Sequence, residues 1–488
     1  MSLAVLHSRG LDGLHAPEIT VEVHLSNGLP SFTLVGLAET EVKEARERVR
    51  CALNNSGLDF PHNRRITVNL APAELPKESG RFDLPIALGI LAASGQIDAT
   101  RLQHFEFVGE LSLAGDVRPV RGALPLALGL RRSAPHRALV LPSASAPEAA
   151  LVPGLKVHTA DHLLEVVQAL LPGDAALCKP LPWAQAAAPA TDPAPVPDWR
   201  DVKGQQGAKR ALEVAAAGGH SALLVGPPGT GKSMLAQRFV HLLPRLNETQ
   251  ALSSAALWSL AGRFDAAHWA RRPFRAPHHS ATAPALVGGG SPPRPGEISL
   301  AHEGVLFLDE LPEYPRSALE ALREPLENGR ITISRAGRQA EFPARFQLLA
   351  AMNPCPCGHL GHPRQACRCS PDAVARYQGR LSGPLLDRID LQIEVPAVHP
   401  ATLSAAPEGD DTATVAQRVL EARDRQWQRQ GALNAHLDGA ALATHATLPA
   451  AAADFFEGTC LRLGWSARAH QRVLRIARTV ADLQGLAD

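Results

Sequence analysis

Short apolar runs alternate with an amphipathic segment in the middle of the chain. Residues 222–225, 305–308 and 348–352 are apolar runs with the length of buried strands. Residues 234–243 have the apolar spacing of an amphipathic helix. This pattern predicts an α/β fold for the central part of the chain.

The region before it contains both kinds of element. The expected strands are residues 19–23, 32–35 and 66–70, and the expected helices are residues 38–54 and 84–93. We therefore expect a separate α+β domain over residues 1–171.

Composition marks the expected domain boundaries. Residues 172–200 carry seven prolines interleaved with alanines, which is typical of an extended, semi-rigid linker. A central α/β core is expected over residues 201–400, followed by a helical part over 401–488. This last part has helical spacing in residues 415–428 and 467–483, apolar on one face and arginine-rich on the other.

Length and charge allow several classes of function. At 488 residues the chain can hold two or three domains, each with its own core. The net charge is only +1, so any nucleic-acid-binding surface must be local. No segment has the length and apolarity of a membrane span, and the N-terminus lacks a signal pattern, so a cytoplasmic protein is expected.

A phosphate-binding motif follows the first apolar run. Its glycines allow backbone N–H groups to close around a β-phosphate, Lys232 reaches the β- and γ-oxygens, and Ser233 ligates Mg²⁺. The helix that follows adds the attraction of its N-terminus for phosphate. The motif consists of Gly226, Pro227, Pro228, Gly229, Thr230, Gly231, Lys232 and Ser233.

The second apolar run ends in two acids. Asp309 is expected to bind the metal, and Glu310 to polarise the attacking water. A glycine-rich turn or an Asp–Glu pair alone is often only a surface feature. Their order, with strand, loop, Lys–Ser, helix and acidic strand end, predicts ATP hydrolysis.

Two stretches lie outside this motif set. His278 and His279 could bind a metal, although adjacent histidines in a proline-flanked loop point apart more often than together. Residues 330–341 alternate apolar and polar positions around Ala–Gly, which predicts a β-hairpin.

Four of the seven cysteines are crowded into one short segment, Cys355, Cys357, Cys367 and Cys369. Two close pairs joined by a turn-rich loop can surround one tetrahedral Zn²⁺. Substitution of one thiolate by His359 or His362, reversible disulfides and plain buried thiols are the alternatives. With four thiolates the zinc would be structural, holding the loop against the preceding strand.

These features together resemble an AAA+ ATPase, a fold that hydrolyses ATP at subunit interfaces. The resemblance implies that Asn353 is the sensor 1 residue beside Glu310. Residues 382–391 resemble the arginine-finger segment of magnesium chelatases and MCM helicases, which implies that Arg388 reaches the γ-phosphate of a neighbouring subunit. An ion pair of Arg388 with Asp387 or Asp390 is the alternative.

Two further roles follow from the same resemblance. Arg468, after an expected N-cap at Ser466, corresponds to the sensor 2 arginine that closes the lid on the nucleotide. The hairpin corresponds to a pore-facing insertion, so Arg335 and Arg338 at its tip would line the pore and contact DNA. A solvated hairpin that makes subunit contacts is the alternative.

The order of elements in residues 1–171 is similar to that of a Lon-protease-like domain. The position of the catalytic serine falls at Phe82, and that of the lysine near Pro125. Ser79 is close, but no lysine lies between Lys77 and Lys156 to serve it. A degenerate protease fold is therefore expected, kept for assembly or substrate contact.

Over its whole length the chain resembles the ComM (YifB) family of bacterial magnesium-chelatase-like proteins. This implies a hexameric, ATP-driven motor that promotes branch migration of single-stranded or branched DNA during natural transformation. Family members continue beyond the helix at 467–483, whereas this chain ends at Asp488, so a truncated lid is expected. The alternative is a magnesium-chelatase subunit that remodels a protein partner.

Overall fold

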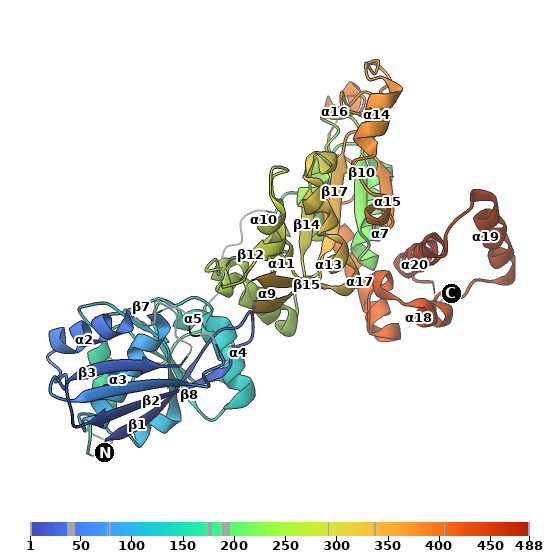
Figure 1. The fold of residues 1–488 in the computed structure, drawn as a ribbon. Coiled ribbons are helices and arrows are strands. Elements are labelled where there is room, and N and C mark those ends of the chain that lie inside the picture. The colour runs from blue at the N-terminus through green and yellow to red at the C-terminus, as the bar shows by residue number, and fades with distance from the viewer. Residues whose placement is uncertain are drawn as a thin grey trace.

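A seven-stranded mixed sheet forms the N-terminal domain of the protein (Figure 1). The computed structural model describes residues 2–36, 44–75, 77, 80–173, 178–187, 196–290, 292–335, 338–404 and 406–486. The strand order is β3-β4-β2-β1-β5-β8-β9, with antiparallel pairing of β4, β2 and β1 and parallel pairing elsewhere. The strands are β1 (Leu3–Arg9), β2 (Glu18–Ser26), β3 (Ser31–Val35), β4 (Arg65–Ala71), β5 (Phe105–Phe107), β8 (Ala138–Pro142) and β9 (Val157–Ala160).

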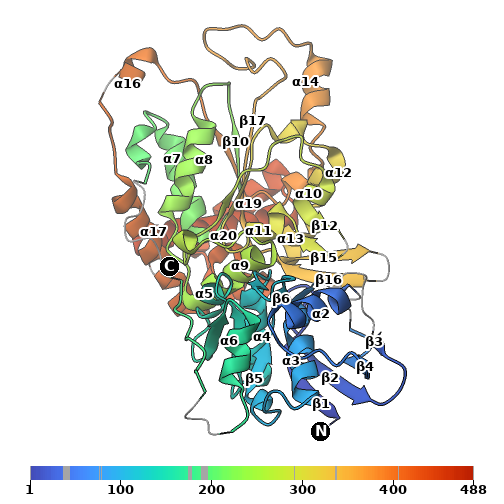
Figure 2. The same cartoon turned by 90° about the vertical axis from the view of Figure 1, so that its left-hand side faces the viewer.

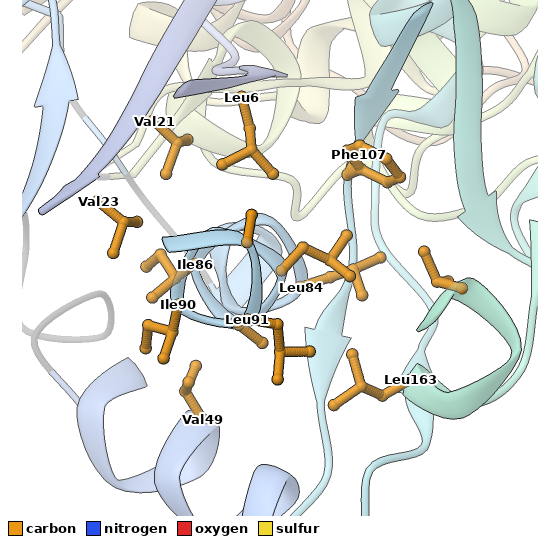
Figure 3. Close-up of a cluster of buried hydrophobic side chains, with 14 of the residues drawn as sticks. Leu6, Val21, Val23, Val49, Leu84, Ile86, Ile90, Leu91, Phe107 and Leu163 are labelled. Atoms are coloured by element: carbon orange, nitrogen blue, oxygen red, sulfur yellow. The ribbon is translucent and has the colours of Figure 1, made fainter. Parts of the chain in front are cut away.

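The helix expected at residues 84–93 lies at the centre of this domain. It is α3 (Asp83–Ala93), and each of its residues is buried, as expected for a helix that is apolar all round. Figure 3 shows Leu6, Val21 and Val23 of the sheet on one side of α3. Helices α2 (Ala45–Asn55) and α6 (Leu163–Ala169) cover the other sides through Val49 and Leu163.

The three strands expected here are confirmed as β2, β3 and β4. The expected helix at 38–54 corresponds to α2, and residues 37–43 lie outside the described part of the chain. Phe82 and Pro125, the positions aligned with a protease serine and lysine, are both buried. Lys77 is buried and donates from Nζ to the carbonyl of Pro72, while Ser79 lies outside the described residues.

The central domain contains a five-stranded sheet with all strands parallel, in the order β11-β14-β17-β10-β18. Along β14, Val305 and Phe307 pack into the core on one face, and Leu306 and Leu308 into the core on the other. Burial on both faces explains the continuous apolar runs in the sequence. The strands are β10 (Ala222–Val225), β11 (Phe274–Arg275), β14 (Val305–Leu308), β17 (Gln347–Met352) and β18 (Leu391–Glu394).

Helices flank this sheet and extend into the C-terminal part (Figures 1 and 2). The expected helices are confirmed as α8 (Lys232–Phe239), α17 (Thr412–Gln430) and α20 (Ala467–Gln484). In the central and C-terminal parts, the remaining helices of eight or more described residues are α7 (Gln206–Gly218), α9 (Glu248–Leu260), α14 (Pro371–Gln378) and α19 (Ala450–Leu463). Both α17 and α20 contact α7, for example through Arg423 Nε and the carbonyl of Ala216, 2.8 Å apart.

Helix α9 joins the central domain to the N-terminal one by packing on α4 (Ala123–Ser133). The hydroxyl of the buried Ser259 accepts from the backbone of Leu124 at 3.3 Å and donates to Glu148 Oε1 at 3.1 Å. Ser259 and Glu148 also line a cavity of about 470 Å³ between the domains. The joint therefore contains a buried polar contact as well as apolar packing.

Candidate nucleotide-binding site

The site lies at the carboxyl edge of the central sheet. Strands β10, β14 and β17 are adjacent, and Gly226, Asp309 and Asn353 each directly follow one of them. Because parallel strands end at the same edge, residues that are far apart in the sequence meet there. The sheet order thus brings the phosphate-binding motif and the acidic motif to the same edge of the sheet.

The loop between β10 and α8 has the shape of a phosphate cradle. A Cβ at Gly226 would lie 2.1 Å from the carbonyl oxygen of Val395, so a side chain does not fit. Gly231 has φ +92°, a left-handed conformation that glycine adopts without strain. The hydroxyl of Thr230 donates to the carbonyl of Pro227 at 3.0 Å and closes the loop. This tight turn, with glycines where a side chain is excluded or φ is positive, is the kind of loop that closes around an anion.

Lys232 begins α8 with its side chain buried in this loop. Its Nζ donates to the carbonyls of Gly226 at 2.7 Å and Pro227 at 2.8 Å, and to Asn353 Oδ1 at 3.2 Å. Burial lowers the pKa of Lys232, and the charge of Asp309 acts in the opposite direction. The ammonium group is therefore held between the loop and the proposed sensor residue.

Ser233 and Asp309 form the second contact between the two motifs. The hydroxyl of Ser233 donates to Asp309 Oδ2 at 2.6 Å, and Asp309 Oδ1 accepts from the backbone of Glu310 at 2.9 Å. A hydroxyl and a carboxylate on adjacent elements are hard oxygen donors of the kind that Mg²⁺ prefers. The residues present thus fit the metal that the sequence predicts.

Glu310 contacts a residue that the sequence analysis did not assign to the site. Its Oε2 lies 2.8 Å from Nδ1 of His279, in the loop that follows β11. The rings of His278 and His279 lie 4.0 Å apart between centroids, so the expectation that they point apart is wrong. A two-residue strand is too short to recognise in sequence, which is why the contact was missed.

Arg388 and Arg468 form a separate group around Glu327, on α13 (Arg323–Asn328). Arg388 donates from Nη2 to Glu327 and from Nη1 to the carbonyl of Pro384 at 2.6 Å, and Arg468 Nη2 lies 3.8 Å from Glu327. The intrachain ion pair of Arg388 is thus with Glu327 rather than with either neighbouring aspartate. Among the described residues, neither arginine bonds to the phosphate loop.

The four clustered cysteines converge. Their sulfur atoms all lie within 4.8 Å of one another, and Cys355 lies 3.5 Å from Cys357 and 3.6 Å from Cys367. Four sulfurs around a tetrahedral zinc, with bonds of about 2.3 Å, are about 3.8 Å apart. The donor set therefore fits a structural zinc. His359 and His362 are not part of this group.

The cysteine loop also touches the phosphate loop. A Cβ at Gly358 would lie 2.6 Å from Cδ of Pro228, which shows how closely the two loops approach. The carbonyl of Pro354 accepts from Gln378 Nε2 of α14 at 3.0 Å. The cysteine loop therefore contacts both the phosphate loop and α14.

Comparison with known proteins gives family matches along most of the chain. Residues 198–403 match the family described as magnesium chelatase, subunit ChlI, residues 21–145 match subunit ChlI of Mg-chelatase, and residues 409–488 match its C-terminal family. The uncharacterized protein YifB of Salmonella typhimurium is 51% identical over 100% of this chain and 94% of its own length. YifB of Escherichia coli and the competence protein ComM of Haemophilus influenzae are each 51% identical over 99% of this chain and 94% of theirs.

The chain belongs to the ComM (YifB) family.

Membership of this family makes the chain a magnesium-chelatase-like AAA+ protein and confirms the expected α/β fold of the core. It also supports ATPase activity with ATP and Mg²⁺. No helix in the described part of the chain is long and apolar enough to cross a membrane.

The hairpin expected at residues 330–341 is present in this family member as β15 (Arg330–Arg335) and β16 (Arg338–Pro343). Arg335 and Arg338 form its last backbone pair, and their side chains lie outside what the structure describes. The other end of the ladder is packed, since Ile331, Ile333 and Phe342 are buried. The hairpin, whose strands β15 and β16 are labelled in Figure 2, therefore has an apolar base against the core.

Proposed function

We propose that this protein is an ATP-driven motor that acts on single-stranded or branched DNA as a homohexamer. The observation that carries the ATPase part is the convergence of Lys232, Ser233, Asp309 and Asn353 at one edge of the sheet. These residues supply a cation for phosphate, two oxygen donors for Mg²⁺ and an amide for orienting water.

The chain's own residues would divide the chemistry as follows. ATP with Mg²⁺ supplies the phosphoanhydride bond that is broken. Lys232 neutralises the β- and γ-phosphate charge, while Ser233 and Asp309 hold the metal. Glu310 accepts a hydrogen bond from the attacking water. The oxygen of this water bonds to the γ-phosphorus, while the bond from that phosphorus to the bridging oxygen breaks and the bridging oxygen leaves with ADP. The proton ends on the released phosphate.

Arg388 is the residue that would make ATP hydrolysis depend on subunit assembly. We propose that it completes the site of a neighbouring subunit, where it stabilises the charge of the transferring phosphoryl group. In the single chain its two Nη atoms are bonded to Glu327 and Pro384. To reach a neighbouring subunit, Arg388 has to exchange these two contacts for a phosphate. The exchange is favoured because the charged phosphate oxygens form strong, charge-assisted hydrogen bonds with arginine. Arg468 is proposed as the lid contact to the nucleotide.

DNA is proposed as the substrate on the basis of the hairpin and of the relatives. The Haemophilus influenzae relative is named a competence protein, which is consistent with DNA handling in transformation. In a ring, Arg335 and Arg338 would be repeated in every subunit, so a nearly neutral chain would still present a basic pore. The finer proposal is branch migration during homologous recombination.

The domain boundaries proposed from the sequence are residues 1–171, 172–200, 201–400 and 401–488. The first is proposed as a degenerate Lon-like domain. We also propose that the four cysteines hold a structural Zn²⁺, because their spacing suits tetrahedral thiolate ligation. Four protein ligands leave no open position, so this metal would stabilise the loop rather than react.

ATP hydrolysis with and without DNA tests the proposal. Single-stranded or forked DNA should raise the hydrolysis rate, and DNA affinity should fall steeply as the salt concentration rises. Replacement of Arg335 and Arg338 by Ala should weaken DNA binding and reduce the salt dependence. Arg330→Ala, at the base of the same hairpin, is the matched control, since Arg330 pairs with Glu341 at 3.3 Å.

The second candidate is a chelatase-type subunit that remodels a protein partner, which the family descriptions favour. In that case hydrolysis would not respond to any DNA structure, although Lys232→Ala would still abolish nucleotide binding. ATPase activity without any effect of DNA would therefore reject the DNA motor and keep the ATPase.

A further inference from the structure

His279 is the nearest polar partner of Glu310 in the described part of the chain. Its Nδ1 lies 2.8 Å from Glu310 Oε2, and no other hydrogen bond or ion pair to this carboxylate occurs among the described residues. The Glu310 side chain is 53% exposed, so packing against neighbouring side chains does not fix its orientation. The orientation of this carboxylate thus depends on one histidine.

The sheet register explains why these two residues meet. Strands β11 and β14 are parallel neighbours in which Arg275 pairs with Leu306. His279 and Glu310 each lie four residues beyond this pair, past the carboxyl ends of their strands. The two side chains therefore reach the same edge of the sheet, beside Asp309.

The loop that carries His279 is itself held in place. The hydroxyl of the buried Tyr314 donates to the carbonyl of Pro277 at 2.5 Å. On the other side, Nδ1 of His278 lies 2.8 Å from the hydroxyl of Ser280, while its ring packs on the ring of His279. A donor on a fixed loop can orient a carboxylate at little cost in side-chain entropy.

The backbone of Glu310 adopts an unusual conformation. Its φ is +53°, in the left-handed region that non-glycine residues rarely adopt. Its backbone N–H donates to Asp309 Oδ1 at 2.9 Å, which links this conformation to the metal-binding carboxylate. The backbone is fixed by Asp309, and the side chain by His279.

We infer that His279 is a positioning residue for ATP hydrolysis, which holds one carboxylate oxygen of Glu310 so that the other oxygen faces the attacking water. This rests on the proposed ATPase function and on the role of Glu310 in it. His279 donates a hydrogen bond from Nδ1 and does not itself exchange a proton with substrate.

Steady-state ATP hydrolysis in the absence of DNA tests this inference. His279→Ala should lower kcat about tenfold or more, since a misoriented base loses part of the ~10²–10⁴-fold that proton acceptance contributes. KM for ATP should stay within about twofold, because the contacts of Lys232 and Ser233 are unchanged. The Asn side chain places Nδ2 close to the position of Nδ1, so His279→Asn should restore much of kcat.

Two comparisons separate positioning from a structural effect. His268→Ala removes an exposed histidine that pairs with Asp265 outside this contact, so it should retain the wild-type kcat. Combined with Glu310→Gln, His279→Ala should have no further effect, because both changes act on the same group. Thermal unfolding of His279→Ala should match the wild type, since 36% of the His279 side chain is exposed.

Three outcomes would overturn the inference. One is a wild-type kcat in His279→Ala. Another is a raised kcat in this variant, which would mean that the contact between His279 and Glu310 slows ATP hydrolysis. The third is a kcat that stays low in His279→Asn although the protein is as stable as the wild type. These results concern ATP alone, so they are distinct from a failure of the DNA proposal, in which the wild type hydrolyses ATP but ignores DNA.

Discussion

Glu148→Gln at the domain joint should stabilise the protein at high pH and not at low pH. Glu148 lies on α5 (Ala146–Ala149), where its carboxylate accepts from the hydroxyl of Ser259 of the central domain. Burial raises the pKa of Glu148 from its ordinary value of 4.5 to about 7, although hydrogen bonds from Ser259 and the backbone of Ala123 act in the opposite direction. Glutamine has nearly the same shape and does not ionise.

The sign and size of the effect follow from proton linkage. Below pH 4.5 Glu148 is protonated in both states, and its contribution to the free energy of unfolding is fully present. As the pH rises towards 7, the unfolded chain loses this proton while the folded protein keeps it, so stability falls. Each tenfold difference in proton affinity is worth about 1.4 kcal/mol. The loss is therefore about 3 kcal/mol once the pH exceeds 7.

Urea unfolding of the wild type and Glu148→Gln, followed by circular dichroism between pH 5 and pH 8, measures this difference. The variant should gain about 3 kcal/mol over the wild type at pH 8 and much less at pH 5. Glu457→Gln on the exposed surface of α19 is the control and should show no such trend. A difference that does not change with pH would refute the argument, and would mean that water in the 470 Å³ cavity solvates Glu148.

Two further predictions concern assembly and metal. Arg388→Ala should keep ATP binding but lower turnover by about 10³-fold or more, whereas Glu327→Gln, which removes the same intrachain ion pair, should keep turnover. Filter-binding and phosphate-release assays measure the two effects, and turnover that survives in Arg388→Ala would exclude the finger role. Metal analysis of protein purified without chelators should find about one zinc per chain, and replacement of Cys367 and Cys369 by Ser should abolish it and lower Tm. Absence of zinc from the wild type would reject the site.

Local pattern was sufficient to predict several strands and helices of the fold. The apolar run and glycine loop around Lys232 predicted strand, loop and helix, because each depends on neighbours a few residues away. The N-cap at Ser466 is likewise confirmed, with its hydroxyl accepting from the backbone of Ala469 at 3.2 Å. In the N-terminal domain, α3 was recognised because it is apolar throughout, although its complete burial depends on the sheet above it.

The partners of the site residues could not be predicted in the same way. The pairing of Asp309 with Ser233 followed from the order of two known motifs, but the pairing of Glu310 with His279 depends on a two-residue strand at the sheet edge. Arg388 was predicted to be an arginine finger, with an ion pair to Asp387 or Asp390 as the alternative. Within the chain its acidic partner is instead Glu327, 61 residues away.

The amino-acid sequence by itself therefore determined which chemical groups are available and which short segments carry them, since backbone preference and apolar periodicity act over a few residues. The tertiary structure alone decided which of those groups touch, including the Glu148–Ser259 contact between two domains. The physical reason is that such contacts are set by strand order and helix packing, in which residues distant along the chain become neighbours only when the apolar faces of the whole domain are buried together.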